Sequence, residues 1–401
     1  MKKLELLAPA GNLLKMETAF AYGADAVYLG IPDFSLRVRI NDFNLVKIKE
    51  AVRSAHRRGK KIYVTVNIFA HNKHLEKLPP YIKKLRALKI DALIVSDPGI
   101  ISVIKRNWPK AEIHLSTQAN CTNYEAVKFW AKQGIKRIIL GREVSLKEIK
   151  EIHRAAPKME LEYFVHGAMC MAYSGRCFLS KEMLGRSANL GDCAQPCRWQ
   201  FDVSVKAQGH KEEFDLVSEA HGSYLLNSKD LCLIKYLPDL AKAGVMAYKI
   251  EGRAKSAYYL AVICGAYRLA IDQPAKRNYL FKELSQKLVH RGYTTGFFLK
   301  QKGEQNTSNS HQTVSFEFCG EVLAQVKGGL LIKVHNSIYS QDKLEIILPG
   351  YGIIKLVAQI IDPQTNETLS EAHGGGGGQT VILKTKRAGV PVGAVLRREI
   401  K

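Results

Sequence analysis

Short apolar, β-branched runs alternate with amphipathic helical patterns through the first 275 residues, and this alternation restricts the fold more than any other sequence feature. Apolar residues of the helical patterns recur at three and four positions, and glycine closes several of them, as expected just past a helix end. The candidate strands are Glu5–Ala8, Ala26–Gly30, Lys61–Asn67, Ala92–Asp97, Glu112–Ser116, Arg137–Leu140, Met159–His166 and Ala247–Glu251. Eight βα units over residues 1–300 predict an α/β fold with a closed, TIM-like (β/α)8 barrel.

An open, doubly wound sheet is the alternative arrangement of alternating strands and helices. Such a sheet usually carries a G-x-G-x-x-G turn after its first strand. The corresponding turn here is Ala8–Asn12, with the sequence APAGN, which lacks those glycines. The turn therefore favours the barrel.

The C-terminal part of the chain has a different pattern. The polar stretch Gln301–Thr313 has the composition of a linker, which we place at residues 301–314. The strand-like segments beyond it are Ser315–Val326, Leu330–Val334, Lys343–Leu348, Ile353–Ile361, Thr380–Thr385 and Ala394–Arg397. Residues 315–401 are therefore predicted to form a small, barrel-like all-β domain.

The formal net charge of +23 lies almost entirely before residue 315. Residues 315–401 contain ten Lys and Arg against eight Asp and Glu, so they are nearly neutral. An excess of this size favours a polyanionic partner such as nucleic acid. A solvated surface rich in Lys and Arg explains the charge equally well.

The sequence indicates a cytoplasmic protein without a membrane segment. No apolar run approaches eighteen residues, the length that a membrane-spanning helix requires. The N-terminal residues lack the apolar core of a signal peptide. Structural disulfides are rare in the cytoplasm, so the eight cysteines call for burial or for a metal.

Four cysteines lie close together in a glycine-rich excursion at residues 167–200, directly after the seventh candidate strand. Cys170, Cys177, Cys193 and Cys197 have the spacing C-x6-C-x15-C-x3-C, at the barrel end where active sites form. Four thiolates suit an iron–sulfur cluster or zinc, and the absence of a C-x2-C knuckle favours the cluster over zinc and over redox-active thiols. Cys232 is an alternative fourth ligand to Cys197, because the pattern puts it early in a helix that could return to the barrel mouth.

The residues around the first two of these cysteines resemble the signature of the collagenase-like peptidases of unassigned type. The matching positions are Glu162, Phe164, Gly167, Ala168, Met169, Cys170, Gly175, Cys177 and Ser180. Further segments similar to the family are Glu5–Gly11, Gly23–Tyr28, Asn227–Leu231, Lys249–Arg253 and Arg291–Gly296. The resemblance covers the chain from residue 4 to residue 300, with a typical β domain appended.

The resemblance implies a hydroxylase, because several members of this family hydroxylate RNA or a quinone precursor without oxygen on a 4Fe–4S cluster. The element Cys193–Trp199, with the sequence CAQPCRW, is most similar to the tRNA branch. That branch forms 5-hydroxyuridine at the wobble position and takes the hydroxyl group from prephenate. It implies Cys170, Cys177, Cys193 and Cys197 as cluster ligands, and tRNA and a small anionic co-substrate as partners.

Arg142, Lys249 and Arg253 are the best-placed residues at the barrel mouth for a substrate that bears carboxylates, as prephenate does. Arg binds a carboxylate through two parallel hydrogen bonds and Lys acts as a point charge, although each could equally be a surface ion-pair partner. His166, four residues before Cys170, could donate to a cluster sulfur, act as a general acid or base, or be structural. The remaining polar residues at strand ends are Asn67, Asp97, Gln118, Glu143 and Glu251.

Two expectations concern the surroundings of this mouth. Glu162 should lie near the barrel interior and pair with a barrel Arg, if Phe164 and His166 share its face. RNA contacts are expected from Lys and Arg on the rim, with base stacking by Trp199 or Tyr173.

A collagenase-like peptidase is the main alternative function, and another RNA-hydroxylating member of the same family is a closer one. The sequence contains neither an H-E-x-x-H zinc motif nor a G-x-S-x-G elbow, so a peptidase would need a cysteine nucleophile with His166. An RNA-binding module with a structural metal is a third interpretation. Whether a protein partner is needed does not follow from the sequence.

Overall fold

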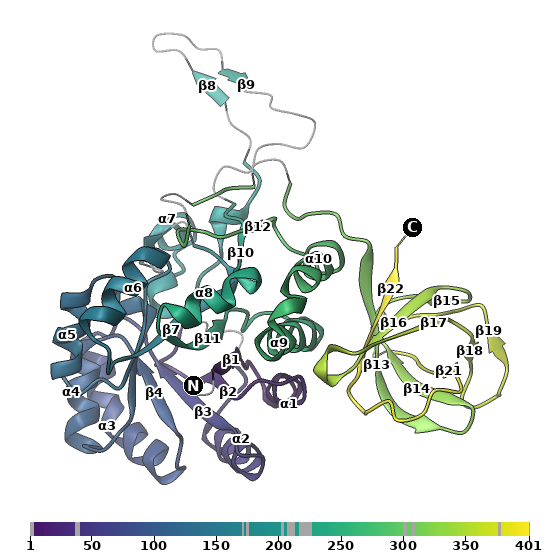
Figure 1. The fold of residues 1–401 in the computed structure, drawn as a ribbon, viewed down its shortest axis with the longest axis horizontal. Coiled ribbons are helices and arrows are strands. Elements are labelled where there is room, and N and C mark those ends of the chain that lie inside the picture. The colour runs from purple at the N-terminus through teal and green to yellow at the C-terminus, as the bar shows by residue number, and fades with distance from the viewer. Residues whose placement is uncertain are drawn as a thin grey trace. The chain divides into compact units, whose positions relative to one another are not determined.

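The computed structural model divides by its contacts into two compact units (Figure 1). The described residues are 4–36, 41–170, 172–173, 176–201, 204–206, 213–215, 227–299, 303–306, 309–375 and 378–400. The first unit consists of Met1–Met16, Asp25–Ala254 and His290–Gln312, and the second of Glu17–Ala24, Lys255–Val289 and Thr313–Lys401. Lys255–Val289 thus groups with the C-terminal segment, although it precedes the predicted linker at residues 301–314.

Eight parallel strands close into a barrel in the first unit. Their order is β11 (Val245–Ile250), β1 (Glu5–Pro9), β2 (Ala26–Gly30), β3 (Lys61–Val66), β4 (Ala92–Val95), β5 (Ile113–Leu115), β6 (Arg137–Ile139) and β7 (Glu160–Ala168). Parallel pairing of β11 with β7 completes the ring. Each strand overlaps one of the eight predicted strands, so the TIM-like fold is confirmed.

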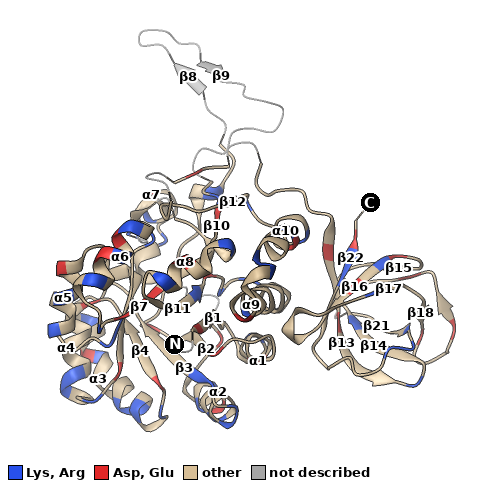
Figure 2. Ribbon diagram, in the orientation of Figure 1, with Lys and Arg blue, Asp and Glu red and all other residues tan. Residues whose placement is uncertain are grey.

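Helices follow the strands along the chain. They are α1 (Leu13–Ala21), α2 (Leu45–Arg57), α3 (Asn72–Ala87), α4 (Pro98–Asn107), α5 (Tyr124–Lys132), α6 (Leu146–Ala155), α7 (Leu179–Leu184), α8 (Leu237–Lys242), α9 (Ala257–Asp272) and α10 (Arg277–Lys287). Figure 2 shows Lys and Arg distributed along helices around the barrel, such as α2 and α3. Among the described residues, no helix combines the length and apolar character needed to cross a bilayer.

Side-chain caps explain where several of these helices begin. Asn44, Asp97, Asn123 and Ser145 each accept a hydrogen bond from the backbone N–H three residues further on. Each such cap stabilises its helix by about 1 kcal/mol. The strand-to-helix turns at the barrel mouth are therefore fixed by local sequence.

Strand β7 extends beyond the barrel and gains a second partner there. β10 (Asp230–Cys232) pairs antiparallel with the end of β7, with Cys232 opposite His166, and β12 (Tyr293–Thr294) pairs with β10. The prediction that Cys232 lies early in a helix is therefore wrong, because α8 begins only at Leu237. A short apolar run fits a strand or a helix equally well, and here pairing with the end of β7 makes it a strand.

The second unit contains an antiparallel half-barrel, which confirms the predicted all-β C-terminal domain. Its strand order is β17 (Ile353–Val357), β16 (Lys343–Ile347), β22 (Val395–Glu399), β13 (Phe316–Val326), β14 (Gly329–Val334), β21 (Thr380–Lys384), β18 (Ile360–Ile361) and β19 (Thr368–Leu369). Alternate strand residues such as Leu330, Ile332 and Val334 are fully buried in one apolar core. Within this unit, Arg397 is completely buried and pairs with Glu283 of α10 at 2.7 Å.

Candidate active site

A cavity of about 160 Å³, which we call the inner cavity, lies at the carboxyl ends of the barrel strands. The polar and aromatic lining residues at strand ends include Tyr28, Thr65, Asn67, Ser116, Gln118, Arg142, Phe164, Lys249, Glu251 and Arg253. Those from the excursion after β7 include Met169, Cys170, Cys177, Ser180, Cys193, Gln195, Cys197 and Arg198. The excursion therefore forms one wall of the cavity and the barrel mouth forms the other.

All four cysteines of the excursion line the inner cavity. Cys170 and Cys193 are exposed, and Cys177 and Cys197 are half-buried. Burial raises the pKa of the Cys197 thiol, Arg198 opposes this, and the other three cysteines raise the pKa further. The four cysteines thus line one cavity, although up to 27 positions separate them along the chain.

Short polar contacts hold the excursion in this conformation. The Cys177 backbone N–H donates to Asn189 Oδ1 at 3.1 Å, and the Ala194 N–H donates to Ser180 Oγ at 3.0 Å. Arg186 and Asp192 form an ion pair at 2.9 Å. These contacts join the two halves of the excursion, so the cysteine pairs before and after α7 stay together.

The chemistry of the donor set fits an iron–sulfur cluster, because four cysteine side chains line one cavity and cysteine thiolates hold such clusters. Among the described residues, no three His, Cys, Asp or Glu side chains are grouped so that they could hold one metal ion.

Cys232 does not belong to this group. Its side chain is buried, it is paired through β10 with His166, and it is not among the residues that line the inner cavity. Cys197 lines the cavity with the other three cysteines. Of the two residues that the sequence left open as fourth ligand, Cys197 therefore lies at the inner cavity and Cys232 is not among its lining residues.

Several cations line the inner cavity together with the cysteines. The guanidinium of Arg142 lies 4.0 Å from the centre of the Phe164 ring and 3.7 Å from Glu251. Arg253 donates to Thr65 Oγ1 at 3.4 Å and to the carbonyl of Leu36. Arg198 adds a further positive charge beside Cys197. Cations therefore outnumber carboxylates on the cavity wall, which favours an anionic ligand.

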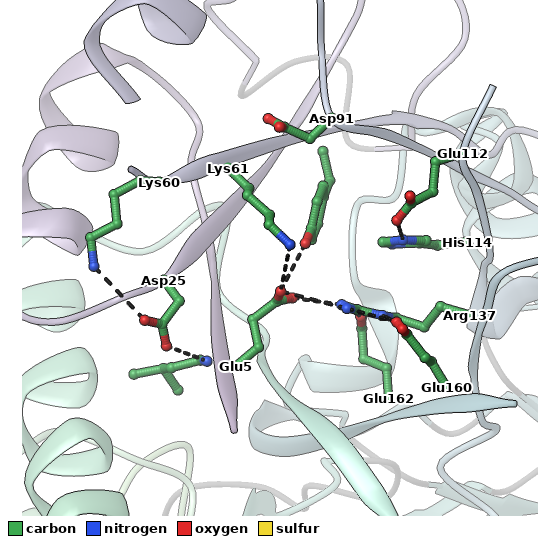
Figure 3. Close-up of polar contacts among 12 residues, drawn as sticks. Glu5, Asp25, Lys60, Lys61, Asp91, Glu112, His114, Arg137, Glu160 and Glu162 are labelled. Atoms are coloured by element: carbon green, nitrogen blue, oxygen red, sulfur yellow. Dashed lines mark hydrogen bonds and ion pairs between the residues drawn. The ribbon is translucent and has the colours of Figure 1, made fainter. Parts of the chain in front are cut away.

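Lys249 joins the inner cavity to a buried ion network in the barrel interior. Its Nζ donates to Glu162 Oε1 at 2.7 Å and lies 4.4 Å from the centre of the Tyr28 ring. Glu162 also accepts from Arg137 at 3.2 Å, and Arg137 in turn pairs with Glu5 and Glu160 (Figure 3). Glu162 thus faces the interior and pairs with an Arg, as predicted.

Burial acts on the pKa values of Glu162 and Lys249 in opposite directions. For Glu162, burial acts to raise the pKa, but Lys249 and Arg137 outweigh it and the pKa is lowered. For Lys249, burial lowers the pKa and the charge of Glu162 opposes this. Glu162 therefore stays ionised, and it orients the ammonium group of Lys249 at the cavity floor.

Not every predicted site residue reaches the inner cavity. Arg142, Lys249 and Arg253 line it, as do Asn67, Gln118 and Glu251. His166 is buried against the Tyr293 ring, with 5.4 Å between ring centres, and is not among the lining residues. Asp97 caps α4. Glu143 contacts a neighbouring, smaller cavity.

A register shift explains the position of His166. Phe164 pairs with Lys249, but Ile250 pairs with His166, so Val165 has no counterpart on β11. Such a bulge interrupts the alternation of side chains. Gly167 follows with a φ of +109°, and a Cβ there would approach the Glu251 carbonyl oxygen to 2.5 Å.

Several lining residues were not identified from the sequence. Tyr28 and Thr65 lie at inward-facing positions of β2 and β3, which strand alternation alone could have indicated. Ser180 and Arg198 lie in the cysteine excursion, and their places in the family signature and in the CAQPCRW element were the signals that could have found them. Gln118 Oε1 is buried without a hydrogen-bond partner, so the cavity also contains an acceptor for a donor group of a ligand.

Comparison with known proteins adds a family and several relatives. Residues 11–308 match Peptidase family U32. The chain is 39% identical to tRNA hydroxylation protein P of Escherichia coli, over 94% of this chain and 93% of that protein. It is 35% identical to a 23S rRNA 5-hydroxycytidine synthase of Escherichia coli, over 86% of this chain and 53% of that protein. It is also 33% identical to a collagenase of Porphyromonas gingivalis, over 74% of each chain.

Proposed function

This chain belongs to peptidase family U32, and on that premise we propose that it is an RNA hydroxylase acting on tRNA. Specifically, it forms 5-hydroxyuridine at the wobble position without oxygen, with prephenate as the hydroxyl source. A 4Fe–4S cluster on Cys170, Cys177, Cys193 and Cys197 would supply iron-based electron exchange at the cavity wall. A relative that matches over nearly its whole length is named for tRNA hydroxylation, whereas 53% of the rRNA enzyme is covered, which supports tRNA over rRNA.

One observation carries this proposal: four cysteines and a set of cations line the same cavity. Arg142 and Arg253 are suited to bind the two carboxylates of prephenate by paired hydrogen bonds, with Lys249 as a point charge at the floor. Tyr28 and Phe164 offer ring faces for the carbocycle. The co-substrate would thus be held in contact with the excursion that carries the cluster ligands.

The same cavity argues against a cysteine peptidase. Such an enzyme needs a histidine within hydrogen-bond reach of its cysteine nucleophile. No histidine of the described residues lines the inner cavity, and the ring of His166 packs against Tyr293. Among the described residues that line this cavity, the family name and the collagenase relative therefore find no matching cysteine–histidine pair.

Anaerobic purification tests the cluster directly. Wild-type protein should contain about four irons and four sulfides per chain, in keeping with one cubane cluster. Cys197→Ala should lose most of this iron, whereas the matched variant Cys232→Ala should retain it. Equal iron in both variants, or loss in Cys232→Ala alone, would refute the ligand assignment.

Nucleoside analysis tests the reaction. Deletion of the gene should remove 5-hydroxyuridine and its derivatives from bulk tRNA, and the wild-type gene should restore them. Arg253→Met should fail to restore them while its purified protein still contains iron. Unchanged tRNA after deletion, with a loss of 5-hydroxycytidine from 23S rRNA instead, would reassign the substrate.

A further inference from the structure

A second, smaller cavity adjoins the inner cavity. It shares Arg142, Met169, Cys170 and Ala172 with the inner cavity, and its other walls are Glu143, Tyr173 and Phe297. We call it the rim cavity. Cys170 and Arg142 therefore stand between two separate spaces, one rich in cations and one with two aromatic walls.

The rim cavity has flat walls that are available to a ligand. Tyr173 is 56% exposed, which is high for a large aromatic side chain. Phe297 is half-buried. The guanidinium of Arg142 is held against the Phe164 ring at 4.0 Å, so its position is fixed before any ligand arrives. Planar aromatic and guanidinium groups are the surfaces on which unstacked bases of RNA are held.

We propose that the rim cavity binds the target pyrimidine of the RNA, unstacked from its neighbours, between Tyr173 and Phe297. This inference rests on the proposed function and adds the place of the second reactant. The small anion then occupies the inner cavity and the base occupies the rim cavity. Arg142 contacts both, and Cys170 lies at their boundary.

An RNA base suits this cavity better than a peptide side chain. The chain carries a formal charge of +23, which favours a phosphate backbone around the site. Enzymes that modify a base must take it out of its stack, and stacking on aromatic side chains compensates for that cost. The shared wall at Cys170 also brings the base to the excursion that holds the proposed cluster.

Photocrosslinking tests the location without any substitution. An anticodon stem-loop RNA with 5-iodouridine at the wobble position is bound to the full, cluster-containing chain, irradiated, and the modified residue is identified by mass spectrometry. The crosslink should fall on Tyr173 or Phe297. A crosslink on Trp199 or on any residue outside the rim cavity would overturn the inference.

Binding of the same RNA, measured by fluorescence anisotropy, provides the second test. Tyr173→Ala and Phe297→Ala should each weaken binding on the order of ten-fold, as expected for loss of one stacking surface. Tyr173→Phe should keep near wild-type affinity, because the ring remains. Phe129→Ala is the matched control, because Phe129 is 55% exposed on α5 and lies outside both cavities.

The outcomes separate this inference from the proposed function. If the wild type hydroxylates tRNA but Phe129→Ala weakens RNA binding as much as Phe297→Ala does, only the rim assignment fails. If the wild type does not hydroxylate tRNA, the proposed function fails. Gelatin peptides are the competing ligand. If they bind the wild type, and if Phe297→Ala weakens their binding but not the binding of RNA, the rim cavity binds a polypeptide and the inference is overturned.

Discussion

The barrel interior and the barrel mouth both contain buried charge, but they balance it differently. In the interior, Arg137 has three carboxylate partners, Glu5, Glu160 and Glu162, and Glu162 is shared with Lys249. At the mouth, Arg142 and Arg253 border a cavity whose nearest carboxylate, Glu251, lies 3.7 Å from Arg142. Interior charges are thus matched within the protein, whereas the cations of the mouth exceed their acidic neighbours.

This contrast indicates different roles for the same residue types. A TIM barrel usually fills its interior with branched apolar side chains, so an ion network there must be internally complete to be tolerated. A cation excess in a cavity with low-dielectric walls concentrates anions from solution. We therefore expect interior substitutions to lower stability and mouth substitutions to lower affinity.

The largest expected effect is on stability, from Arg137→Met in the interior. Arg137 is only 6% exposed, and its removal leaves Glu5, Glu160 and Glu162 without their common partner. Loss of one member of a buried ion group costs about 3–5 kcal/mol. Urea unfolding of the purified protein measures this change, and a variant as stable as the wild type would remove the distinction between interior and mouth.

The next effect concerns affinity, from Arg142→Met at the mouth. Loss of a hydrogen bond to a charged ligand costs about 1.5–3 kcal/mol, so prephenate should bind at least ten-fold more weakly. Stability should change less than in Arg137→Met, because Arg142 loses one carboxylate partner at 3.7 Å, whereas Arg137 loses three. Calorimetric titration with prephenate measures the affinity, and urea unfolding measures the stability. A variant that loses stability but keeps its affinity for prephenate would contradict the proposed difference between interior and mouth.

The sequence was sufficient to predict the barrel and most of its mouth. Strand periodicity is a local property, and polar residues that follow parallel strands must meet at one end of the barrel. Arg142, Lys249 and Arg253 were found in this way, and Cys170 and Cys197 through their spacing. The positions of these residues at the mouth could be predicted because each depends only on neighbours in the chain or on the closure of the barrel.

The positions that the sequence did not predict correctly depend on pairing between segments that are distant in the chain. Cys232 was expected in a helix, but the edge of β7 recruits it into a strand. His166 was expected at the mouth, but the bulge between β7 and β11 interrupts the alternation that would put it there. Neither the edge nor the bulge has a signature in the residues themselves. Phe297 was missed for the same reason, since only the fold brings it beside Cys170.

The smallest expected effect is on the pH dependence of the unfolding free energy, which Glu162→Gln should reduce. The lowered pKa means that folded Glu162 stays charged below 4.5, the ordinary value at which the unfolded chain takes up its proton. The stability that Glu162 contributes is therefore fully present above that pH and is lost as the pH falls through the folded-state pKa. The loss amounts to about 1.4 kcal/mol for each pH unit by which the pKa is lowered.

Urea unfolding of wild type and Glu162→Gln between pH 3 and pH 7 measures this contribution. The difference in unfolding free energy should be largest near neutral pH and should shrink as the pH falls below 4.5. Glu76→Gln on the exposed face of α3 is the matched control, because it removes one carboxylate without touching the network. If the difference between wild type and Glu162→Gln were constant across this range, Glu162 would not be an ionised partner of Arg137 and Lys249. The interior would then hold its charges by packing rather than by mutual compensation, and the contrast with the mouth would disappear.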